Sequence, residues 1–292
     1  MPIGTSQFLP PAAALAAALC LAVDANAQAD ANERQAQPTL IAEHSSIAPG
    51  STVRIAVDFA INPGWHLYWP GRNDTGFEPQ VEWELPEGWT IGDLHWPAPI
   101  RYVSPGDILD HIYEDRLTLI ADLTAPADAT DAVDIAAELS WLVCKDVCIP
   151  EDARVSIALP VSASSQPTQH AGAFTAAEAR WPVVSDTAAF TTDWTGTTLR
   201  IAATGAAERI AFFPHADAPG LDNAIDAPAR DGRVLTLGFT REFGPIRHVS
   251  GLLEITRGNA TRWLAFDVPG PAPTAPAPDT HPGTAPQTQP HH

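Results

Sequence analysis

Hydrophobic and polar residues alternate with a period of two over many short segments of the chain. Such alternation is typical of β-strands that bury one face, because successive side chains of a strand point to opposite sides. Between residues 38 and 161 it is clear in four segments: 51–59, 116–123, 133–143 and 153–159. Proline, glycine and aspartate separate these segments, and short strands at such spacing predict a β-sandwich.

A second series of alternating segments follows: 198–202, 209–213, 233–239, 251–255 and 263–268. We therefore expect an all-β protein of two β-sandwich domains in tandem, over residues 38–162 and 180–268. The segment between them, residues 163–179, is rich in Ser, Ala, Gln and Thr and follows no clear period. It is predicted to be a linker with one helical turn.

The two ends of the chain have a different composition. An apolar run over residues 12–23 precedes Ala25-Asn26-Ala27. The run is too short for a membrane span and is typical of a signal peptide cleaved at an A-x-A site. We expect residues 1–27 to be this signal peptide, 28–37 a disordered segment and the Pro-, Ala- and Thr-rich residues 269–292 a disordered tail. The mature protein is expected to be exported and to have no membrane span of its own.

Charge and motifs exclude several classes of function. The chain carries 35 Asp and Glu against 16 Lys and Arg, a net charge of −19. Such a balance argues against nucleic acid as a partner, because phosphate binding needs clustered Lys and Arg. The sequence contains no HExxH, G-x-S-x-G, P-loop or G-x-G-x-x-G motif. We therefore expect no hydrolase or nucleotide-binding activity.

The candidate chemistry lies in two of the three cysteines. Cys20 would leave with the signal peptide, so the mature chain keeps Cys144 and Cys148. Residues four apart in one strand are about 13 Å apart, whereas the Cα atoms of a disulfide are about 4.4–6.8 Å apart. A hairpin over residues 145–147, between the strands predicted on either side, would bring the two sulfurs together.

Three roles remain open for this pair from the residues alone. A structural disulfide would stabilise little, since it closes a loop of only three residues. A redox-active disulfide suits an exported protein. Lys145, the single lysine, favours a thiolate, whereas the nearby acidic residues oppose it. Two thiolates also suit Cu(I), and the histidines that could join them are His66, His95 and His111.

Several segments resemble one protein family. They are Ile112–Leu119, Trp141–Pro150, Gly64–Trp69 and the tryptophan-rich stretch over 88–99. Together they resemble the N-terminal periplasmic domain of the thiol:disulfide interchange protein DsbD. They are closer still to the ScsB (suppressor of copper sensitivity) branch, which has the same short cysteine spacing. The resemblance covers about residues 38–161 well, and residues 180–268 resemble the second domain of that branch less specifically.

The resemblance implies an immunoglobulin-like fold and a redox function. The cysteines would cycle between dithiol and disulfide, with Cys148 forming mixed disulfides and Cys144 resolving them. The chain would act as a periplasmic protein-disulfide reductase without a cofactor. Its implied partners are a separate membrane electron-donor protein and periplasmic thioredoxin-like proteins. The alternative implied by the ScsB branch is a copper-tolerance module that binds Cu(I) through Cys144 and Cys148.

The resemblance also points to residues around the cysteines. His66 and Tyr68 are expected on the strand face opposite Trp65, Leu67 and Trp69, next to the cysteine site. Further candidates are Lys145, Trp141 and a cap loop that includes Tyr102, Pro105 and Asp107. An alternative interpretation makes the five tryptophans between 65 and 96 a sugar-stacking platform, although tryptophan on strands is more often buried.

Overall fold

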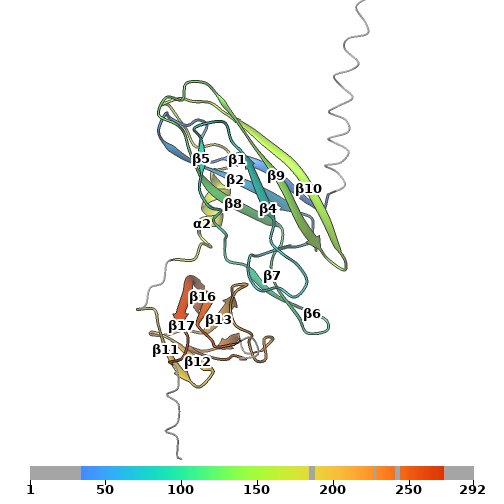
Figure 1. Cartoon of the computed structure of the whole chain (residues 1–292), viewed down its shortest axis with the longest axis vertical. Helices are drawn as coiled ribbons and strands as arrows, with labels where there is room; N and C mark the ends of the chain where they lie inside the picture. Colours follow the sequence, from blue (N-terminus) through green and yellow to red (C-terminus); the bar gives the residue numbers. More distant parts are fainter. Residues whose placement is uncertain (1–33, 184–187, 227, 241–243, 273–292) are drawn as a thin grey trace, which may run out of the picture.

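The structure of the protein is a computed structural model that describes residues 34–183, 188–226, 228–240 and 244–272. The expected signal peptide and most of the expected C-terminal tail lie outside the described residues. The strands that pair in sheets all do so antiparallel, and they form two groups of sheets, one above the other in Figure 1. The all-β prediction is confirmed.

The first group consists of two facing sheets. One has the strand order β1-β2-β8-β5 and the other β10-β9-β4. The first of these sheets contains β1 (Ala36–Ala42), β2 (Thr52–Ile61), β8 (Arg116–Thr124) and β5 (Thr90–Ile91). The second contains β10 (Cys148–Leu159), β9 (Val133–Cys144) and β4 (Gln80–Glu84). Alternate residues of these strands point inward, as the period of two predicts.

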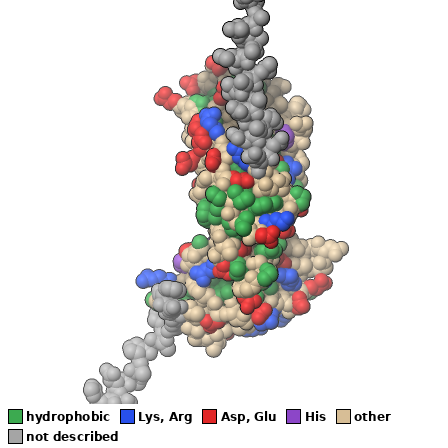
Figure 2. Space-filling view, turned by 90° about the vertical axis from the view of Figure 1, so that its right-hand side faces the viewer, with side chains coloured by type: hydrophobic (Ala, Val, Ile, Leu, Met, Phe, Trp, Pro, Cys, Tyr) green, Lys and Arg blue, Asp and Glu red, His purple; other side chains and the backbone are tan. Residues whose placement is uncertain are grey.

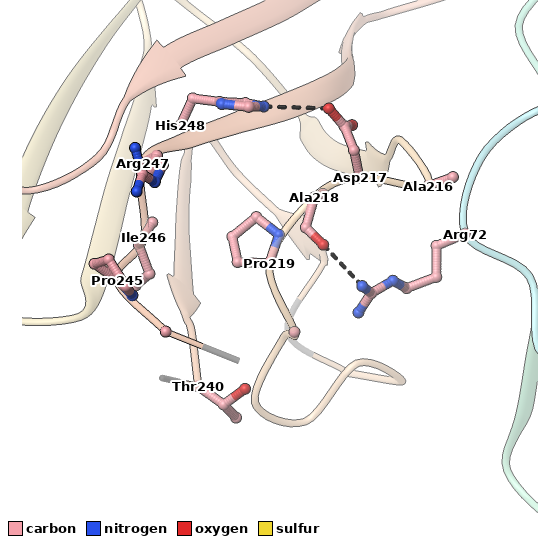
Figure 3. A pocket seen from close by; sticks show the side chains of 12 residues that line it. Arg72, Ala216, Asp217, Ala218, Pro219, Thr240, Pro245, Ile246, Arg247 and His248 are labelled. Carbon is pink, nitrogen blue, oxygen red and sulfur yellow. Dashed lines mark hydrogen bonds and ion pairs between the residues drawn. The ribbon is translucent and has the colours of Figure 1, made fainter. Parts of the chain in front are cut away.

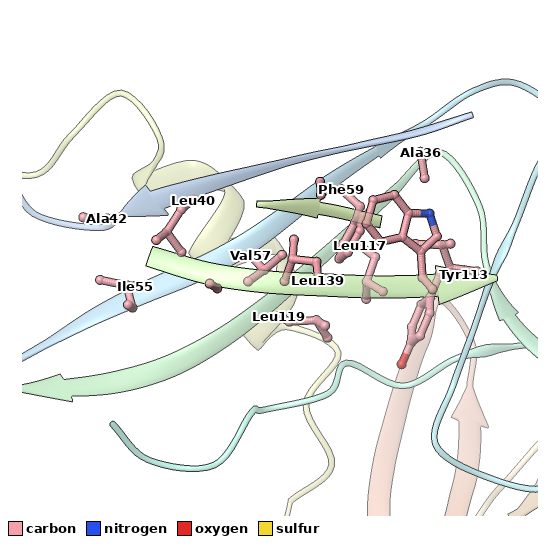
Figure 4. Packing of buried hydrophobic residues seen from close by; sticks show 14 of the residues in the cluster. Ala36, Leu40, Ala42, Ile55, Val57, Phe59, Tyr113, Leu117, Leu119 and Leu139 are labelled. Carbon is pink, nitrogen blue, oxygen red and sulfur yellow. The ribbon is translucent and has the colours of Figure 1, made fainter. Parts of the chain in front are cut away.

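Between the two sheets lies an apolar core. Figure 4 shows Val57 of β2 and Leu119 of β8 directed toward Leu139 of β9. All three side chains are buried. Burial of such side chains is the main favourable contribution to folding, at about 25 cal/mol for each Å² of apolar surface removed from water.

A small third sheet lies beside the end of this sandwich where β9 and β10 turn (Figure 1). Its strand order is β3-β7-β6. The strands are β3 (Leu67–Tyr68), β7 (Ile108–Tyr113) and β6 (Ile100–Ser104). A backbone bridge between His66 and Cys144 connects the start of β3 with the end of β9. The third sheet therefore lies beside the cysteines.

The second group of sheets has its own apolar core. Its sheets have the orders β11-β12-β15 and β14-β13-β16-β17. The strands of the smaller sheet are β11 (Phe190–Thr195), β12 (Thr198–Ala203) and β15 (Val234–Gly238). Those of the larger sheet are β14 (Ala229–Asp231), β13 (Arg209–Pro214), β16 (His248–Arg257) and β17 (Ala260–Pro269).

The two groups of sheets are in contact. Phe213 of β13 and Leu252 of β16 belong to the second group, yet they pack into the core of the first. The backbone of Gly71 also forms a bridge with that of His215. The two-domain division of the chain stays a prediction.

Residues 163–179 are more ordered than the predicted linker. They contain α2 (Ala171–Glu178), the one helix among the described residues. Phe174 and Ala177 of this helix are buried against Ile41 of β1 and Ile120 of β8. The helix therefore covers the outer face of the first sheet. Its apolar face consists mostly of alanine, and so small a contrast with the other face gave no readable period.

Two strands begin earlier than the pattern predicts. β1 starts at Ala36, within the segment expected to be disordered, and β10 starts at Cys148 and continues through Pro150. A proline has no N–H to donate, so it is tolerated mainly in edge strands. β10 lies at the edge of its sheet, which is why Pro150 does not delay the start of the strand.

Candidate functional site

The two cysteines face each other at the end of the β9–β10 hairpin. Cys144 is the last residue of β9 and pairs directly with Cys148, the first residue of β10. Their Cα atoms are 4.1 Å apart and the sulfurs form a disulfide. Residues 145–147 make the tight connection, in which the N–H of Lys145 donates to the carbonyl of Val147 at 3.1 Å. The hairpin proposed from the sequence is therefore present.

The two cysteine residues differ in their exposure to solvent. Cys144 is 2% exposed, whereas Cys148 belongs to the exposed residues of the hairpin end. A thiolate that attacks a disulfide must reach a sulfur along the S–S axis, and access decides which sulfur it meets. Of the two residues, Cys148 is therefore the more accessible from solvent.

His66 and Tyr68 lie beside the disulfide on the inner side. The backbone of His66 exchanges two hydrogen bonds with that of Cys144, at 2.9 and 3.0 Å. Two residues further, the phenol oxygen of Tyr68 is 3.6 Å from Cys148 Sγ and 3.3 Å from His66 Nε2. Tyr68 is fully buried and packs with Cys144 and Ile112. Leu67 and Trp69 point the other way, into the core.

A chain of hydrogen bonds leads from a buried carboxylate to the disulfide. Asp110 of β7 is 2% exposed and accepts hydrogen bonds from the backbone N–H groups of Asp74 and Thr75, at 2.9 and 3.0 Å. It also accepts the hydroxyl proton of Thr75 at 2.6 Å. Thr75 Oγ1 in turn lies 2.9 Å from the phenol oxygen of Tyr68.

The hydrogen bonds from Tyr68 through Thr75 to Asp110 all run in one direction. Thr75 has one hydroxyl proton, which it donates to Asp110, so Tyr68 must donate its own proton to Thr75. The phenol oxygen is then left as an acceptor toward His66 Nε2 and Cys148 Sγ. When the disulfide is reduced, this oxygen can accept a hydrogen bond from the thiol of Cys148. Asp110 does not touch the sulfur, yet it determines whether the phenol of Tyr68 donates a hydrogen bond to Cys148 Sγ or accepts one from it.

Burial also changes the titration of the groups next to the disulfide. Desolvation lowers the pKa of His66, although the charge of Asp110 acts in the opposite direction. Desolvation likewise raises the pKa of Tyr68. The imidazole and the phenol are therefore both neutral around pH 7.

The expected cap loop is the hairpin between β6 and β7. Tyr102 packs beside the disulfide, with its ring 5.4 Å from that of His66. Pro105 and Asp107 lie at the exposed tip of this hairpin, where Asp107 has a φ of 60°. Tyr102 therefore forms part of the wall, whereas the structure gives Pro105 and Asp107 no contact with the sulfurs.

Two other candidates lie away from the sulfurs. Lys145 is exposed on the connecting loop, near Gly64. Trp141 belongs to the opposite face of the hairpin, because it is an odd number of residues from Cys144. Its ring packs edge-on against Phe59 at 5.1 Å and its indole N–H donates to Glu151 at 3.1 Å. Trp141 is thus a core residue and does not line the disulfide.

The histidines considered for Cu(I) are dispersed. His95 stacks on Trp181 at 4.5 Å, and His111 is buried between Trp69 and Phe213. Within the described residues, no group of three or more His, Cys, Asp or Glu has an arrangement that could hold a metal ion.

Asp110 and Thr75 were not identified from the sequence, and they complete the site. No motif joins them, since they meet only through the fold. Asp110 nevertheless leaves a signal, because it and His111 stand between Leu109 and Ile112 in a strand whose other residues are apolar or aromatic. A buried carboxylate is costly unless it accepts several hydrogen bonds, so such a position indicates a polar network.

Comparison with known proteins identifies a family that matches the part of the chain with the two cysteines. The family described as "Thiol:disulfide interchange protein DsbD, N-terminal" matches residues 35–160. This part of the chain belongs to the DsbD N-terminal domain family. The family and the closed disulfide together support thiol–disulfide exchange as the chemistry of Cys144 and Cys148. No curated protein matches the chain significantly in sequence.

Two solved structures match the chain. The N-terminal periplasmic domain of ScsB from Proteus mirabilis has a TM-score of 0.56 and 18% identity, and the match covers 82% of this chain and 96% of that one. The reduced DsbD N-terminal domain from Neisseria meningitidis has 15% identity and a TM-score of 0.27, over 45% of this chain and 91% of that one. The first likeness extends over both groups of sheets, and the immunoglobulin-like β fold predicted for this chain is confirmed.

The relatives also bear on location. DsbD N-terminal domains are periplasmic. In the part of the chain that the structure describes, none of the helices has the length and apolar character needed to cross a membrane.

Proposed function

We propose that this protein relays reducing equivalents between protein thiols in the periplasm through the Cys144–Cys148 pair. The observation that carries the proposal is the difference between the two cysteine residues, of which Cys148 is exposed and Cys144 is buried. A pair that served only as a structural link would gain nothing from one accessible sulfur. It would also stabilise little across a three-residue loop.

The relay consists of two exchanges that balance in electrons. A thiolate of the donor protein attacks Cys148 Sγ, the S–S bond breaks and Cys144 leaves as a thiolate. A second donor thiolate then releases Cys148, so the donor is oxidised and the pair is reduced by two electrons. In the next step the Cys148 thiolate attacks the disulfide of an acceptor. Cys144 then attacks Cys148 Sγ, which restores the disulfide and releases the acceptor as a dithiol.

The surroundings of Cys148 suit a protein as the exchange partner. Val147 and Ile149, on either side of it, are 64% and 36% exposed. Phe77, Ile100 and Val103 are the other large exposed apolar residues of the segments beside the site. On the side of the molecule that Figure 2 shows, hydrophobic side chains gather near the middle. Such exposed apolar surface is typical of protein-binding sites.

The proposal is tested by trapping mixed disulfides. In Cys144→Ser the reduced Cys148 can attack a partner but nothing resolves the product, so mixed disulfides with periplasmic thioredoxin-like proteins should accumulate. Cys148→Ser, the matched control, should form none. Non-reducing gels with mass spectrometry of the trapped species give the readout. Equal trapping by both variants would contradict the order of attack.

The reduction potential of the unmodified chain is the second measurement. Equilibration with glutathione should give a value between about −180 and −270 mV, the range of proteins that exchange disulfides. A value below about −300 mV is typical of structural disulfides and would refute the relay.

A further inference from the structure

The second group of sheets holds both walls of the disulfide site. One wall is the segment from Trp69 to Phe77, which carries Thr75 and covers Tyr68. The other is β6, which carries Tyr102. Each wall is bound by an arginine to backbone carbonyls of residues 215–226, the segment that follows β13 in the second group. We call this segment the strap.

Arg72 connects the first wall to the strap. Its guanidinium Nη2 donates to the carbonyl of Ala218 at 2.7 Å, and its backbone N–H donates to the carbonyl of Pro214 at 3.0 Å. Figure 3 shows the Arg72 side chain reaching across from the first group of sheets to Ala218. Thr75, which hydrogen-bonds Tyr68, follows three residues later in the same segment.

The contact between this wall and the second group is close. A Cβ atom placed on Gly71 would lie 1.8 Å from the ring of Trp69 and 2.8 Å from the carbonyl oxygen of Pro214. Gly76, further along the segment, lies against Tyr68, since a Cβ there would be 2.2 Å from its ring. The segment is thus pressed against the second group at one end and against the phenol at the other.

Arg101 connects the second wall to the strap. Its guanidinium donates to the carbonyl of Ile225, and it is half-buried at this contact. Tyr102, the next residue of β6, points to the opposite side and packs on His66. One residue of β6 therefore binds the strap while its neighbour lines the site.

We infer that Arg72 and Arg101 are positioning residues, and that through them the strap fixes how closely the two walls surround the disulfide. The inference rests on the proposed function for its biological meaning. Other hydrogen bonds tie the two walls to β7, and the two arginine bonds add to the free energy that local opening of the walls costs. Their loss exposes Tyr68, His66 and the S–S bond to incoming thiols.

The test compares rates of disulfide reduction in the full mature chain. Excess dithiothreitol attacks Cys148 Sγ through one thiolate and expels Cys144. Its second thiolate then releases Cys148, leaving oxidised dithiothreitol and the reduced pair. The variant is Arg72→Ala combined with Arg101→Ala. The matched control is Arg257→Ala, which removes an arginine bond to the carbonyl of Thr204, 2.6 Å long and distant from the site.

We expect the double variant to be reduced about three- to tenfold faster than the unmodified chain, the range that loss of one or two ordinary hydrogen bonds gives to a local opening equilibrium. Arg257→Ala should leave the rate unchanged. Arg72→Lys with Arg101→Lys keeps a donor at each carbonyl and should return the rate most of the way. If the double variant fails to fold, Arg72→Ala alone should still accelerate reduction about threefold.

Two outcomes overturn the inference. One is a double variant that is reduced at the rate of Arg257→Ala, and the other is a lysine pair that reacts as fast as the alanine pair. Failure of the relay is seen separately, because the dithiothreitol comparison measures rates of reduction and the glutathione equilibration measures the reduction potential. A pair that stays oxidised in equilibrium with glutathione refutes the relay and leaves the comparison of rates intact.

Discussion

The two faces of the β9–β10 hairpin end differ in composition although their residues alternate along the same strands. One face presents Trp141 and Val143 to the apolar core, where the indole packs on Phe59. The other face presents Cys144 to a small cluster around Tyr68. Stability and chemistry are therefore separated by a single step along the strand. This separation lets the disulfide change its oxidation state beside a core that stays packed.

β7 repeats the same arrangement. Asp110 belongs to the hydrogen-bonded chain that reaches the disulfide, whereas the ring of His111 lies between Trp69 and Phe213, against the second group of sheets. Asp110 accepts three hydrogen bonds, whereas His111 Nε2 has no hydrogen-bond partner in the structure. The comparison teaches that substitutions on the packed side should change stability, and those on the disulfide side should change reactivity.

The largest expected effect comes from the core face. Trp141→Ala should lower the free energy of unfolding by about 3–5 kcal/mol, because it removes a large buried side chain and leaves a cavity. The potential of the disulfide should hardly change, since Trp141 does not touch it. Urea unfolding and glutathione equilibration give the two readouts, and Trp141→Phe should cost less. A large shift in potential without a loss of stability would break the comparison between the faces.

The next effect depends on pH and involves His111. Burial lowers the pKa of His111 to about 4, whereas the unfolded chain has a histidine pKa of about 6.5. The unfolded state therefore binds more protons between these values, and stability is lost as the pH falls from about 6.5 toward 4. The whole loss amounts to about 3 kcal/mol at 1.36 kcal/mol per pKa unit.

The control for this pH effect is His111→Gln, which cannot titrate. Its stability should fall less steeply between about pH 6.5 and 4. Urea midpoints measured across this range give the comparison. Parallel curves for the variant and the unmodified chain would show that His111 is not the group responsible.

The smallest effect on stability, and the sharpest on reactivity, is expected from Asp110→Asn. The amide keeps the shape and can accept the two backbone N–H groups, but it can also donate to Thr75 and so reverse the direction of the chain. Tyr68 would then donate toward Cys148 instead of accepting from it. The reduced variant should be alkylated by iodoacetamide several-fold faster at pH 7, because a donor favours the thiolate.

Thr75→Val provides the matched comparison for this reversal. This substitution removes the hydroxyl that connects Tyr68 with Asp110 and leaves the Asp110 carboxylate in place. Tyr68 is then free to donate to Cys148, so alkylation should again become faster. Unchanged alkylation rates in both variants would mean that the direction of these hydrogen bonds does not affect the reactivity of Cys148.

Much of the fold could be predicted from the sequence because the strands are half-buried and alternate visibly. The pairing of Cys144 with Cys148 could also be anticipated, since a three-residue connection leaves few other geometries. The direction of the Trp141 side chain follows from strand alternation, because an odd separation from Cys144 places it on the opposite face of β9. Thr75 and the strap could not be predicted, because their contacts depend on how distant segments meet.

Pro150 in β10 has a consequence for how another molecule can approach. β10 is an edge strand, and an edge offers free N–H and C=O groups along which a second chain can add as a further strand. Two residues after Cys148 the proline interrupts that row, since it has no N–H. A second protein chain therefore cannot add as a regularly hydrogen-bonded strand at Pro150, next to Cys148. At this end of the hairpin a second chain can make contact through side chains instead.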